Sequence, residues 1–375
     1  MKKNIAIIFP SFELLGAQRV MADYSMKLYK LGHSVTIYSG GDGELKDELS
    51  QLPIKYFFKK YKSKYNKFYR LVKGIVTLGF QLFYQKYDII ISFAPFQNRV
   101  LCLLKLTKIF NCKLILEDHA YPPLSNYEEF KNPLVRLLFF KSEFLYNYAD
   151  TLKVLTYECA DYYQKKLQNV KIKIFPNLLD FTRIENLLSN QNNVIKKRKR
   201  IVSLGRLVNQ KNLFFLIDAF AKIDSKEDYE LLIIGNGYLE HTLKKYVKDK
   251  KIKNILFIDS SIYNYSILKS ADVFVICSRW EGLVLTVIEA MYLEVPVVAS
   301  YFEAGLSFQI GINEKRGYIS AMGDQESFSK KIIHVLNNQN TKEIADKVNS
   351  AKKFVLDQFC IKKNFNNYFD IILND

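Results

Sequence analysis

The hydrophobic positions of the chain alternate between short continuous apolar runs and longer amphipathic segments. The apolar run NIAIIFP (4–10) is followed by the amphipathic segment 17–32 and by a second apolar run, SVTIYS (34–39). Continuous apolar runs of this length are typical of strands that are buried on both faces, whereas the segment between them has the period of a helix. The order strand–helix–strand predicts a βαβ unit with a parallel sheet.

The same alternation occurs twice along the chain. We therefore predict an α/β fold of two doubly wound, Rossmann-like domains that face each other across a cleft, with ligands bound beyond the carboxyl ends of the strands. Further strands are predicted at 87–93 and 112–118 and, after a polar stretch at 187–200, at 200–205, 229–235, 254–259, 272–278 and 295–300. The predicted parts are a first domain at 1–185, a linker at 186–199, a second domain at 200–355 and a C-terminal helix at 356–375 that packs back on the first domain.

Length and composition favour a cytosolic protein with two hydrophobic cores. The 375 residues suffice for two medium domains, and a hydrophobic content of 49% argues against global disorder. No apolar run is as long as a membrane span, and the amino-terminal apolar stretch is too soon interrupted for a clear signal peptide. The five cysteines are odd in number and scattered, which is typical of reduced thiols.

The net charge of +17 leans to the first half of the chain and is densest in one segment. Residues 55–73 hold eight basic and seven aromatic residues and no acid. Such a segment suits an anionic membrane surface, where lysines meet headgroups and aromatic rings lie in the interface. A solvated basic helix or loop explains the pattern equally well. Nucleic acid is not predicted as a partner, since no recognised nucleic-acid motif accompanies the charge.

The core-like segment EGLVLTVIE (281–289) begins and ends with a glutamate. Glu281 follows a predicted strand, and the helix that starts after Gly282, near Leu283 and Val284, offers free N–H groups for an anion. Glu289 lies further along, about 10–12 Å away at the rise of a helix, which matches a sugar, a diphosphate and a ribose in series. The other interpretation is that Glu281 only caps the helix and Glu289 faces solvent.

Two cations follow the strand at 200–205. Arg206 and Lys211 are predicted to point toward the same strand edge, where they would neutralise a diphosphate. The chain has no Asp-x-Asp triplet and its four histidines are isolated, so no metal site is predicted. A pair of surface cations is the other interpretation. Gly235 and Gly237 form a Gly-x-Gly turn at another strand end, a weak signal that any tight βα turn can produce.

Taken in order, the segments SLGRLVNQKN, LLIIGNGYLE and LKSADVFVICSRWEGLVLTVIEAMYLEVPVVAS resemble the large retaining glycosyltransferase family 4, which has the GT-B fold. The match covers most of 200–320. In the first half, ELLGAQRVMADYSMKLYKLGHSVTIYS is similar to the family's first strand–loop–helix, and LILEDHAYPP (114–123) to its Glu-His loop.

The resemblance implies roles for matching residues. Arg206 and Lys211 would hold the donor diphosphate as it leaves, Glu281 would contact the donor hexose and Glu289 the ribose. His119 would lie by the reacting sugar; a loop histidine bonded to backbone is the other interpretation. Gly16 and its neighbours would line the acceptor side. The implied catalytic residues are Glu281, His119, Arg206 and Lys211, and the implied donor-site residues are Gly16, Gly205, Arg206, Lys211, Gly235, Gly237, Gly282, Leu283, Val284 and Glu289.

Several residues depart from the family pattern. Leu15 stands where a second glycine is common, and Gln18 where Glu is common. Glu294 replaces a glycine, which strains the backbone only if its φ is positive. The segment 303–310 replaces a glycine-rich loop and places Gln309 near the usual acid, and 257–261 lacks the glycine often seen where the nucleotide base packs. These departures bear on the donor more than on the fold.

The resemblance implies a retaining, metal-independent glycosyltransferase that needs no cofactor besides its donor substrate. It would move a hexose or N-acetylhexosamine from a nucleotide sugar, expected to be UDP-linked, to a glycan or polyprenyl-diphosphate-linked acceptor. It would work at the cytoplasmic face of a bacterial membrane, as a peripheral protein in surface-glycan assembly. Two other classes stay open at this point: a GT-B sugar-nucleotide epimerase and a non-enzymatic protein that binds anionic surfaces.

Overall fold

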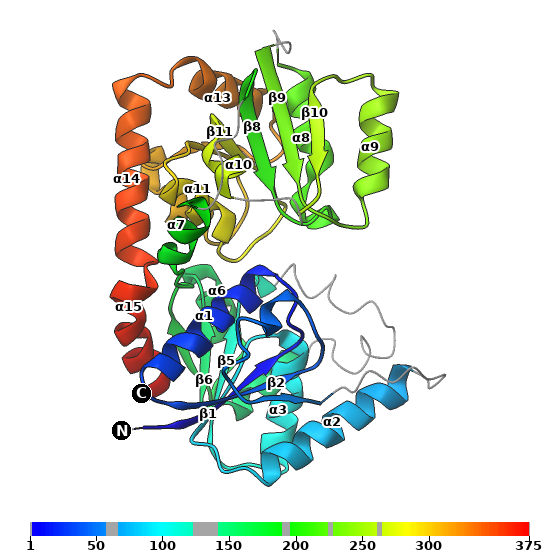
Figure 1. The fold of residues 1–375 in the computed structure, drawn as a ribbon, viewed down its shortest axis with the longest axis vertical. Helices are drawn as coiled ribbons and strands as arrows, with labels where there is room; N and C mark the ends of the chain where they lie inside the picture. The colour runs from blue at the N-terminus through cyan, green and yellow to red at the C-terminus, as the bar shows by residue number, and fades with distance from the viewer. Residues whose placement is uncertain are drawn as a thin grey trace. The chain divides into compact units, whose positions relative to one another are not determined.

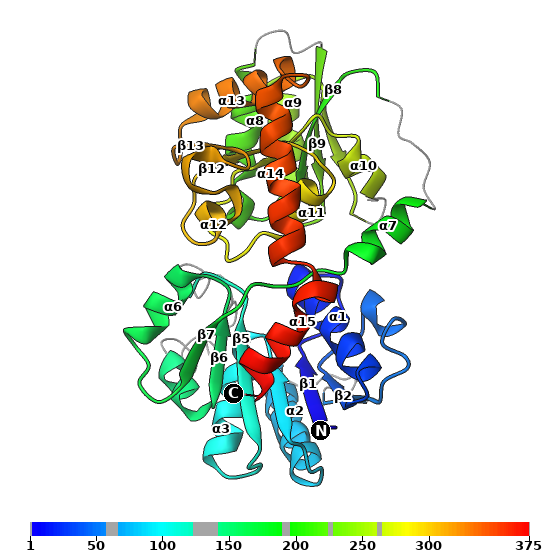
Figure 2. The ribbon, with the colours of Figure 1, turned by 90° about the vertical axis from the view of Figure 1, so that its left-hand side faces the viewer.

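Two parallel β-sheets organise the chain, one in each of two compact units (Figures 1 and 2). The computed structural model describes residues 2–57, 67–122, 142–189, 196–223, 228–260 and 265–374, without the side chains of 67–71 and 312. Unit 1 comprises Met1–Leu179 and Asn364–Asp375, and unit 2 comprises Asp180–Lys363. The prediction of two doubly wound domains is confirmed.

The sheet of unit 1 has the strand order β3-β2-β1-β4-β5-β6-β7, and the order reverses between β1 and β4. Its strands are β1 (Asn4–Phe9), β2 (Ser34–Ser39), β3 (Ile54–Tyr56), β4 (Ile89–Ser92), β5 (Lys113–Asp118), β6 (Thr151–Val154) and β7 (Lys171–Ile174). The helices of this unit are α1 (Gly16–Lys30), η1 (Glu44–Lys46), α2 (Lys67–Phe83), α3 (Pro95–Leu106), η2 (Ser142–Tyr148) and α6 (Tyr157–Gln164), with the C-terminal part of α15 (Ile361–Tyr368) and the π-helical turn η6 (Phe369–Asn374).

The continuous apolar runs form the central strands of unit 1, as their pattern predicts. Ile5, Ile7 and Ile8 of β1 are fully buried, because helices cover both faces of the sheet. Helix α1 ends where Gly32 takes a φ of +88°, the left-handed conformation that favours glycine after a helix. The C-terminal residues pack against α1, since the ring of Tyr368 lies 4.5 Å from that of Tyr24.

The sheet of unit 2 has the strand order β10-β9-β8-β11-β12-β13, which reverses between β8 and β11. Its strands are β8 (Lys199–Leu204), β9 (Tyr229–Ile234), β10 (Ile255–Ile258), β11 (Val273–Ile276), β12 (Val297–Ser300) and β13 (Tyr318–Ser320). Its helices are α7 (Phe181–Ser189), η3 (Asn209–Lys211), α8 (Leu213–Ala221), α9 (Glu240–Asp249), α10 (Tyr265–Lys269), α11 (Leu285–Tyr292), α12 (Leu306–Ile310), η5 (Ile312–Glu314), α13 (Gln325–Asn337) and α14 (Lys342–Gln358).

The division between the units falls earlier in the chain than the predicted domain boundary at 185. Helix α7 belongs to unit 2, because the ring of Phe181 stacks on Tyr292 with centroids 4.2 Å apart and because the Tyr292 hydroxyl donates to Glu185. At the other end of the chain, the residues from Asn364 onward belong to unit 1. The polar stretch 187–200 is therefore not the boundary between the units, because its described residues, 187–189 and 196–200, belong to unit 2.

The part of the chain that the structure describes contains no helix long and apolar enough to cross a membrane. The basic and aromatic segment predicted to face a membrane, 55–73, lies largely outside the described residues, which omit 58–66.

Candidate functional site

The residues predicted to bind an anion in unit 2 lie where its strand order reverses, at the carboxyl ends of β8 and β11. Lys211, at the end of η3, and Glu281, in the loop after β11, form an ion pair with 2.6 Å between Nζ and Oε1. Their side chains are 16% and 13% exposed. A small pocket opens beside them, lined among others by Gly205, Lys211, Cys277 and Ser278. Ligands of doubly wound sheets bind at such a reversal.

Two residues without a predicted role complete this ion pair. Ser278 donates its hydroxyl to Oε1 of Glu281 at 2.8 Å, and the amide of Gln210 donates to Oε2 at 3.2 Å. Oε1 of Gln210 accepts a hydrogen bond from the exposed Arg206 at 3.3 Å. The structure thus brings Arg206, Lys211 and Glu281 into one hydrogen-bonded cluster, which we call the Lys211–Glu281 cluster. Both carboxylate oxygens of Glu281 already have donors within it.

The three glycines of this region let backbone segments approach closely. A Cβ on Gly235, whose φ is +143°, would lie 2.0 Å from the carbonyl oxygen of Gly205, and one on Gly237 would lie 2.3 Å from that of Leu207. A Cβ on Gly205 would lie 2.8 Å from the side chain of Lys211. The glycines therefore place the loop that carries Arg206 and leave room for the lysine chain above it.

A buried side-chain amide forms hydrogen bonds with the backbone at the start of α11. Gln309, which is fully buried, accepts from the N–H of Val284 at 3.2 Å and donates to its carbonyl at 2.8 Å. One of the N–H groups expected to meet an anion is therefore already paired. Gly282 lies beneath Gly305, whose φ is +74° and whose Cβ would lie 2.0 Å from the Gly282 carbonyl oxygen, and Leu283 is buried next to it.

Glu289, on α11, has its own set of partners. The hydroxyl of Tyr265 donates to Oε1 at 3.0 Å, and Arg183 lies close enough for its charge to act on the carboxyl. Burial raises the pKa of Glu289 to about 7, although Arg183 and the Tyr265 hydrogen bond both act to lower it. Glu289 therefore does not simply face solvent: it is a partly buried carboxyl whose pKa is raised toward neutrality.

The backbone at Glu294 is in the left-handed region, with a φ of +62°. This is the conformation that a glycine adopts without strain, so the departure from the family pattern does strain the turn before β12. The exposed carboxylate forms an ion pair with Lys352 of α14 at 3.1 Å.

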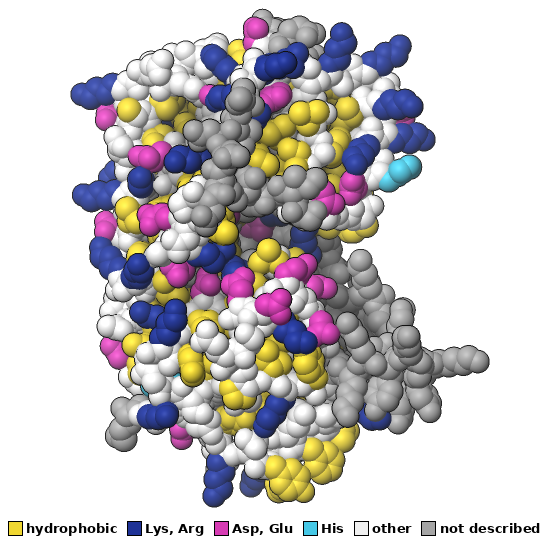
Figure 3. Space-filling model, in the orientation of Figure 1, with side chains coloured by type: hydrophobic (Ala, Val, Ile, Leu, Met, Phe, Trp, Pro, Cys, Tyr) yellow, Lys and Arg dark blue, Asp and Glu magenta, His cyan; other side chains and the backbone are white. Residues whose placement is uncertain are grey.

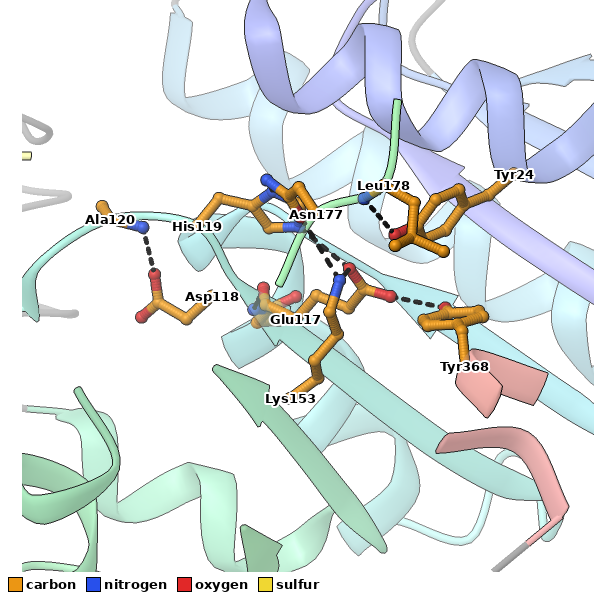
Figure 4. Close-up of polar contacts among 10 residues, drawn as sticks. Tyr24, Glu117, Asp118, His119, Ala120, Lys153, Asn177, Leu178 and Tyr368 are labelled. Carbon is orange, nitrogen blue, oxygen red and sulfur yellow. Dashed lines mark hydrogen bonds and ion pairs between the residues drawn. The ribbon is translucent and has the colours of Figure 1, made fainter. Parts of the chain in front are cut away.

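In unit 1, His119 follows β5 and belongs to a buried network (Figure 4). Its Nε2 lies 2.9 Å from Oε2 of Glu117, and its Nδ1 lies 3.1 Å from the amide nitrogen of Asn177. The ammonium group of Lys153 binds the same Glu117 oxygen at 2.8 Å, and the hydroxyl of Tyr368 donates to Oε1 at 2.6 Å. Both ring nitrogens of His119 thus have side-chain partners, which excludes the interpretation as a histidine bonded to backbone.

The charges of this network decide its protonation. Burial by itself raises the pKa of Glu117, but the charge of Lys153 and the contacts of His119 outweigh it and lower that pKa to about 2. Burial lowers the pKa of His119, and Lys153 lowers it further, against the opposing charge of Glu117. The next residue, Asp118, accepts from the hydroxyl of Tyr163, and burial raises its pKa. The network contains a Glu117–Lys153 ion pair, although burial lowers the pKa of Lys153, and the lowered pKa of His119 favours an uncharged imidazole.

The predicted acceptor loop lies at the start of α1. Gly16 is the first residue of that helix, and Leu15 precedes it in an extended conformation without a side-chain cap. Gln18 is buried, whereas Arg19 binds Glu48 with 2.7 Å between Nη2 and Oε2. Among the residues described, no group of three His, Cys, Asp or Glu side chains is arranged to hold a metal ion.

Sequence reasoning missed the partners that set the chemistry of each predicted residue. Lys153 and Asn177 lie on short, partly polar segments whose role appears only when Glu117 is known to be buried beside them. Tyr368 and Tyr265 are remote in sequence from the carboxylates they bind. Gln210 alone carried a local signal, because it stands between Arg206 and Lys211 in the quoted motif.

Comparison with solved structures identifies the architecture. The crystal structure of HepE from Anabaena in complex with UDP-glucose matches with a TM-score of 0.76 at 16% identity, covering 98% of each chain. Two doubly wound units with this likeness define a GT-B fold. Residues 15–183 match the family model of Glycosyltransferase Family 4, and residues 185–353 match that of Glycosyl transferases group 1. The chain belongs to the GT-B glycosyltransferases.

Two curated relatives are similar over different lengths. The GalNAc-alpha-(1->4)-GalNAc-alpha-(1->3)-diNAcBac-PP-undecaprenol alpha-1,4-N-acetyl-D-galactosaminyltransferase of Campylobacter jejuni is 27% identical over 361 residues, 93% of each chain. An uncharacterised glycosyltransferase of Methanocaldococcus jannaschii is 30% identical over 234 residues, 58% of this chain and 57% of that relative. The chain therefore spans little more than half of the archaeal relative and nearly the whole bacterial one.

Proposed function

We propose that this glycosyltransferase moves a hexose or N-acetylhexosamine from a UDP-sugar to a lipid-linked glycan with retention of anomeric configuration. The observation that carries the proposal is the Lys211–Glu281 cluster at the strand-order reversal of unit 2. A fixed ammonium group and an exposed guanidinium lie there beside a pocket, and the ammonium is paired with a carboxylate. This arrangement suits a diphosphate next to a sugar with hydroxyl groups.

In this proposal the cations act on the leaving group. Negative charge grows on the diphosphate as the glycosidic bond breaks, so Lys211 and Arg206 stabilise the transition state more than the bound substrate. Lys211 would share its ammonium between the diphosphate and Glu281, and Glu281 would accept from hexose hydroxyls. Glu289 would accept from the ribose. The departing phosphate oxygen would assist removal of the acceptor proton on the same face, so neither an enzyme nucleophile nor a metal is required.

The proposed donor and acceptor follow from the similar proteins. HepE was solved with UDP-glucose, and the relative from C. jejuni is named for an undecaprenol-diphosphate-linked glycan. An acceptor on a polyprenyl diphosphate is anchored at a membrane, which favours peripheral attachment at the cytoplasmic face and a part in surface-glycan assembly.

Helix α2 supports a membrane surface as partner. Its apolar residues Val72, Val76, Phe80 and Phe83 are 43–62% exposed and recur at helical spacing along one stripe. Figure 3 shows hydrophobic side chains gathered at the lower end of unit 1, where α2 ends. From residue 55 to 87 the sequence contains no acidic residue, so the charges that neighbour the stripe in sequence are all positive. An exposed apolar stripe with basic neighbours is typical of helices that lie in an anionic interface.

A thermal-shift screen against nucleotide sugars and nucleoside diphosphates tests the donor site. A UDP-sugar should raise the melting temperature of the parent, because a ligand that binds only the folded state stabilises it. Lys211→Ala should lose most of the shift, and the matched control Lys222→Ala, at an exposed lysine of the same unit, should keep it. No shift with any nucleotide sugar would overturn the proposal.

Product analysis then separates the classes. Incubation with the UDP-sugar and a polyprenyl-diphosphate-linked glycan should give a product whose new linkage has the donor's anomeric configuration by NMR. Inversion would refute the retaining mechanism. Formation of an epimerised nucleotide sugar without acceptor would identify the epimerase instead.

Vesicle binding tests the membrane surface. Replacing Phe80 and Phe83 by serine, or Lys59, Lys60, Lys62 and Lys64 by glutamine, should weaken cosedimentation with anionic vesicles, by roughly 1 kcal/mol per lysine. The matched control Phe144→Ser, at a residue 60% exposed in the same unit, should bind like the parent. Turnover of a short water-soluble acceptor should barely change. Unaltered vesicle binding in both variants would exclude this surface.

A further inference from the structure

Lys153 and Asn177 surround the histidine that the proposed function places next to the reacting sugar. Lys153 lies on β6 and Asn177 in the segment after β7, and their exposed fractions are 0% and 2%. Neither side chain has a role in the function proposed above. Asn177 contacts the His119 ring directly, and Lys153 binds the Glu117 oxygen that the ring also contacts, so both are able to control its protonation.

The donors and acceptors of the network allow one arrangement of protons. Lys153 only donates, so the oxygen of Asn177, 3.3 Å from Nζ, faces it. The amide nitrogen of Asn177 then faces Nδ1 of His119 and donates to it. The ionised Glu117 only accepts, so Nε2 of His119 carries the proton. The chain from Lys153 through Asn177 and His119 to Glu117 therefore specifies a single neutral tautomer (Figure 4).

We propose that Lys153 and Asn177 are positioning residues that hold His119 as a neutral imidazole with its proton on Nε2. The proposal rests on the function proposed above, in which His119 lies by the reacting sugar. Cleavage of a glycosidic bond develops positive charge on the sugar ring. An imidazolium at that place would repel this charge and raise the barrier, whereas a neutral ring does not.

Opposing charges act on His119 from several elements. The carboxylates of Glu117 and Asp118 favour an imidazolium, and the ammonium of Lys153 opposes it. Burial also opposes it, since the His119 side chain is only 9% exposed. The described charged or titratable groups packed around this site are Glu117 and Asp118 of β5, Lys153 of β6, Tyr24 of α1, Tyr368 of α15 and, around Asp118, Arg99 of α3 and Tyr163 of α6.

Nitrogen NMR of the full chain tests the network without any substrate. The protein has four histidines, so selective 15N labelling gives few signals, and His119→Gln assigns the relevant one. Long-range 1H–15N spectra distinguish the two neutral tautomers from the imidazolium. At pH 7 the parent should show His119 neutral with the proton on Nε2. An imidazolium, or the other tautomer, would overturn the proposal.

Two substitutions should change this state in a defined direction. Asn177→Asp keeps the shape of the side chain but places an acceptor against Nδ1, so His119 should become an imidazolium at pH 7. Lys153→Met should raise the pKa of His119, because the opposing charge is lost. The matched control Lys165→Met, at a residue 72% exposed in the same unit, should leave the signal unchanged. If Lys153→Met does not fold, Asn177→Asp decides, and an unshifted His119 in that variant refutes the network.

The transfer assay tests what the neutral ring does. Both variants should lower kcat at pH 7 with little change in KM for the donor, and should move the acid limb of the kcat–pH profile to higher pH. A changed NMR state with unchanged kcat would overturn the proposal, since the neutral ring would then serve no step. Failure of the proposed function itself is recognised separately, by the absence of any thermal shift with nucleotide sugars.

Discussion

Glu117 in unit 1 is fully buried and Glu289 in unit 2 is partly buried, and their pKa values shift in opposite directions. Glu117 accepts from Lys153 and His119 on one oxygen and from Tyr368 on the other, and its pKa falls to about 2. Glu289 accepts from Tyr265 and feels the charge of Arg183, and its pKa rises to about 7. Burial raises the pKa of both carboxyls, and the larger number of hydrogen-bond donors and the ammonium group at Glu117 reverse that shift there.

The two networks differ in whether the protein alone supplies the hydrogen bonds that stabilise the ionised carboxylate. Every oxygen of Glu117 is satisfied inside unit 1, so an incoming ligand has nothing to add there. At Glu289 the donors present in unit 2 do not offset the cost of burial, and additional donors from a ligand would lower the free energy of the ionised form. Ribose hydroxyls are such donors, which supports the proposed role of Glu289 and assigns Glu117 to positioning.

The largest expected effect is on stability, at Glu117. Glu117→Gln leaves the Lys153 ammonium buried without its counter-charge and should lower the free energy of unfolding at pH 7 by about 3–5 kcal/mol. Glu289→Gln should change the free energy of unfolding little, because it removes a carboxylate whose ionised form burial disfavours. Urea unfolding of both variants measures this, with the exposed Glu158→Gln as control within about 0.5 kcal/mol of the parent. Similar losses at Glu117 and Glu289 would break the comparison.

The same contrast explains what could be predicted from sequence. The central strands and the motif residues Arg206, Lys211 and Glu281 follow from continuous apolar runs and from the resemblance. The short strands β3, β6, β7 and β13 were not predicted, and β6 shows why: Lys153 interrupts its apolar pattern, and only the long-range partner Glu117 makes a buried lysine there possible. The partners of Glu289 and Glu117 come from distant segments, and no local pattern encodes such contacts.

The second largest effect is expected on kcat, at the Lys211–Glu281 cluster. Lys211→Ala should reduce kcat by about 10²–10³ and raise KM for the donor, because the ammonium stabilises charge that grows on the leaving diphosphate. Added Mg²⁺ or EDTA should change the parent rate little. Steady-state assays of the parent and the variant measure both effects. An unchanged kcat would reduce Lys211 to a ground-state contact, and strong inhibition by EDTA would show that a metal carries the charge.

An intermediate effect is expected on donor affinity, at Glu289. Glu289→Gln should weaken donor binding by about 1.5–3 kcal/mol, the range for a hydrogen bond to a charged group. In the parent, only the ionised carboxyl of Glu289 is a strong hydrogen-bond acceptor. The affinity for the nucleotide sugar should therefore rise by as much as tenfold per pH unit below about pH 7 and level off above it. The variant should show a flat profile. Titration calorimetry between pH 5 and 8.5 measures this, and a pH-independent parent affinity would exclude the ribose role.

The smallest expected effects come from two matched tyrosine substitutions, each of which removes one phenolic hydrogen bond to a carboxylate, Glu117 or Glu289. Tyr368→Phe removes one hydrogen bond to Glu117 and leaves its ion pair with Lys153 intact. The variant should therefore lose about 0.5–1.5 kcal/mol of unfolding free energy and bind the nucleotide sugar with unchanged affinity. Tyr265→Phe removes a donor that lowers the pKa of Glu289, so that pKa should rise further and the pH at which donor affinity levels off should move upward. Its effect on affinity at pH 7 should likewise be about 0.5–1.5 kcal/mol. Urea unfolding and calorimetry on the same two proteins measure both quantities. If Tyr265→Phe altered only stability, Glu289 would not be the carboxylate that binds the sugar donor. If Tyr368→Phe altered the affinity for the sugar donor, Glu117 would not be a purely structural carboxylate.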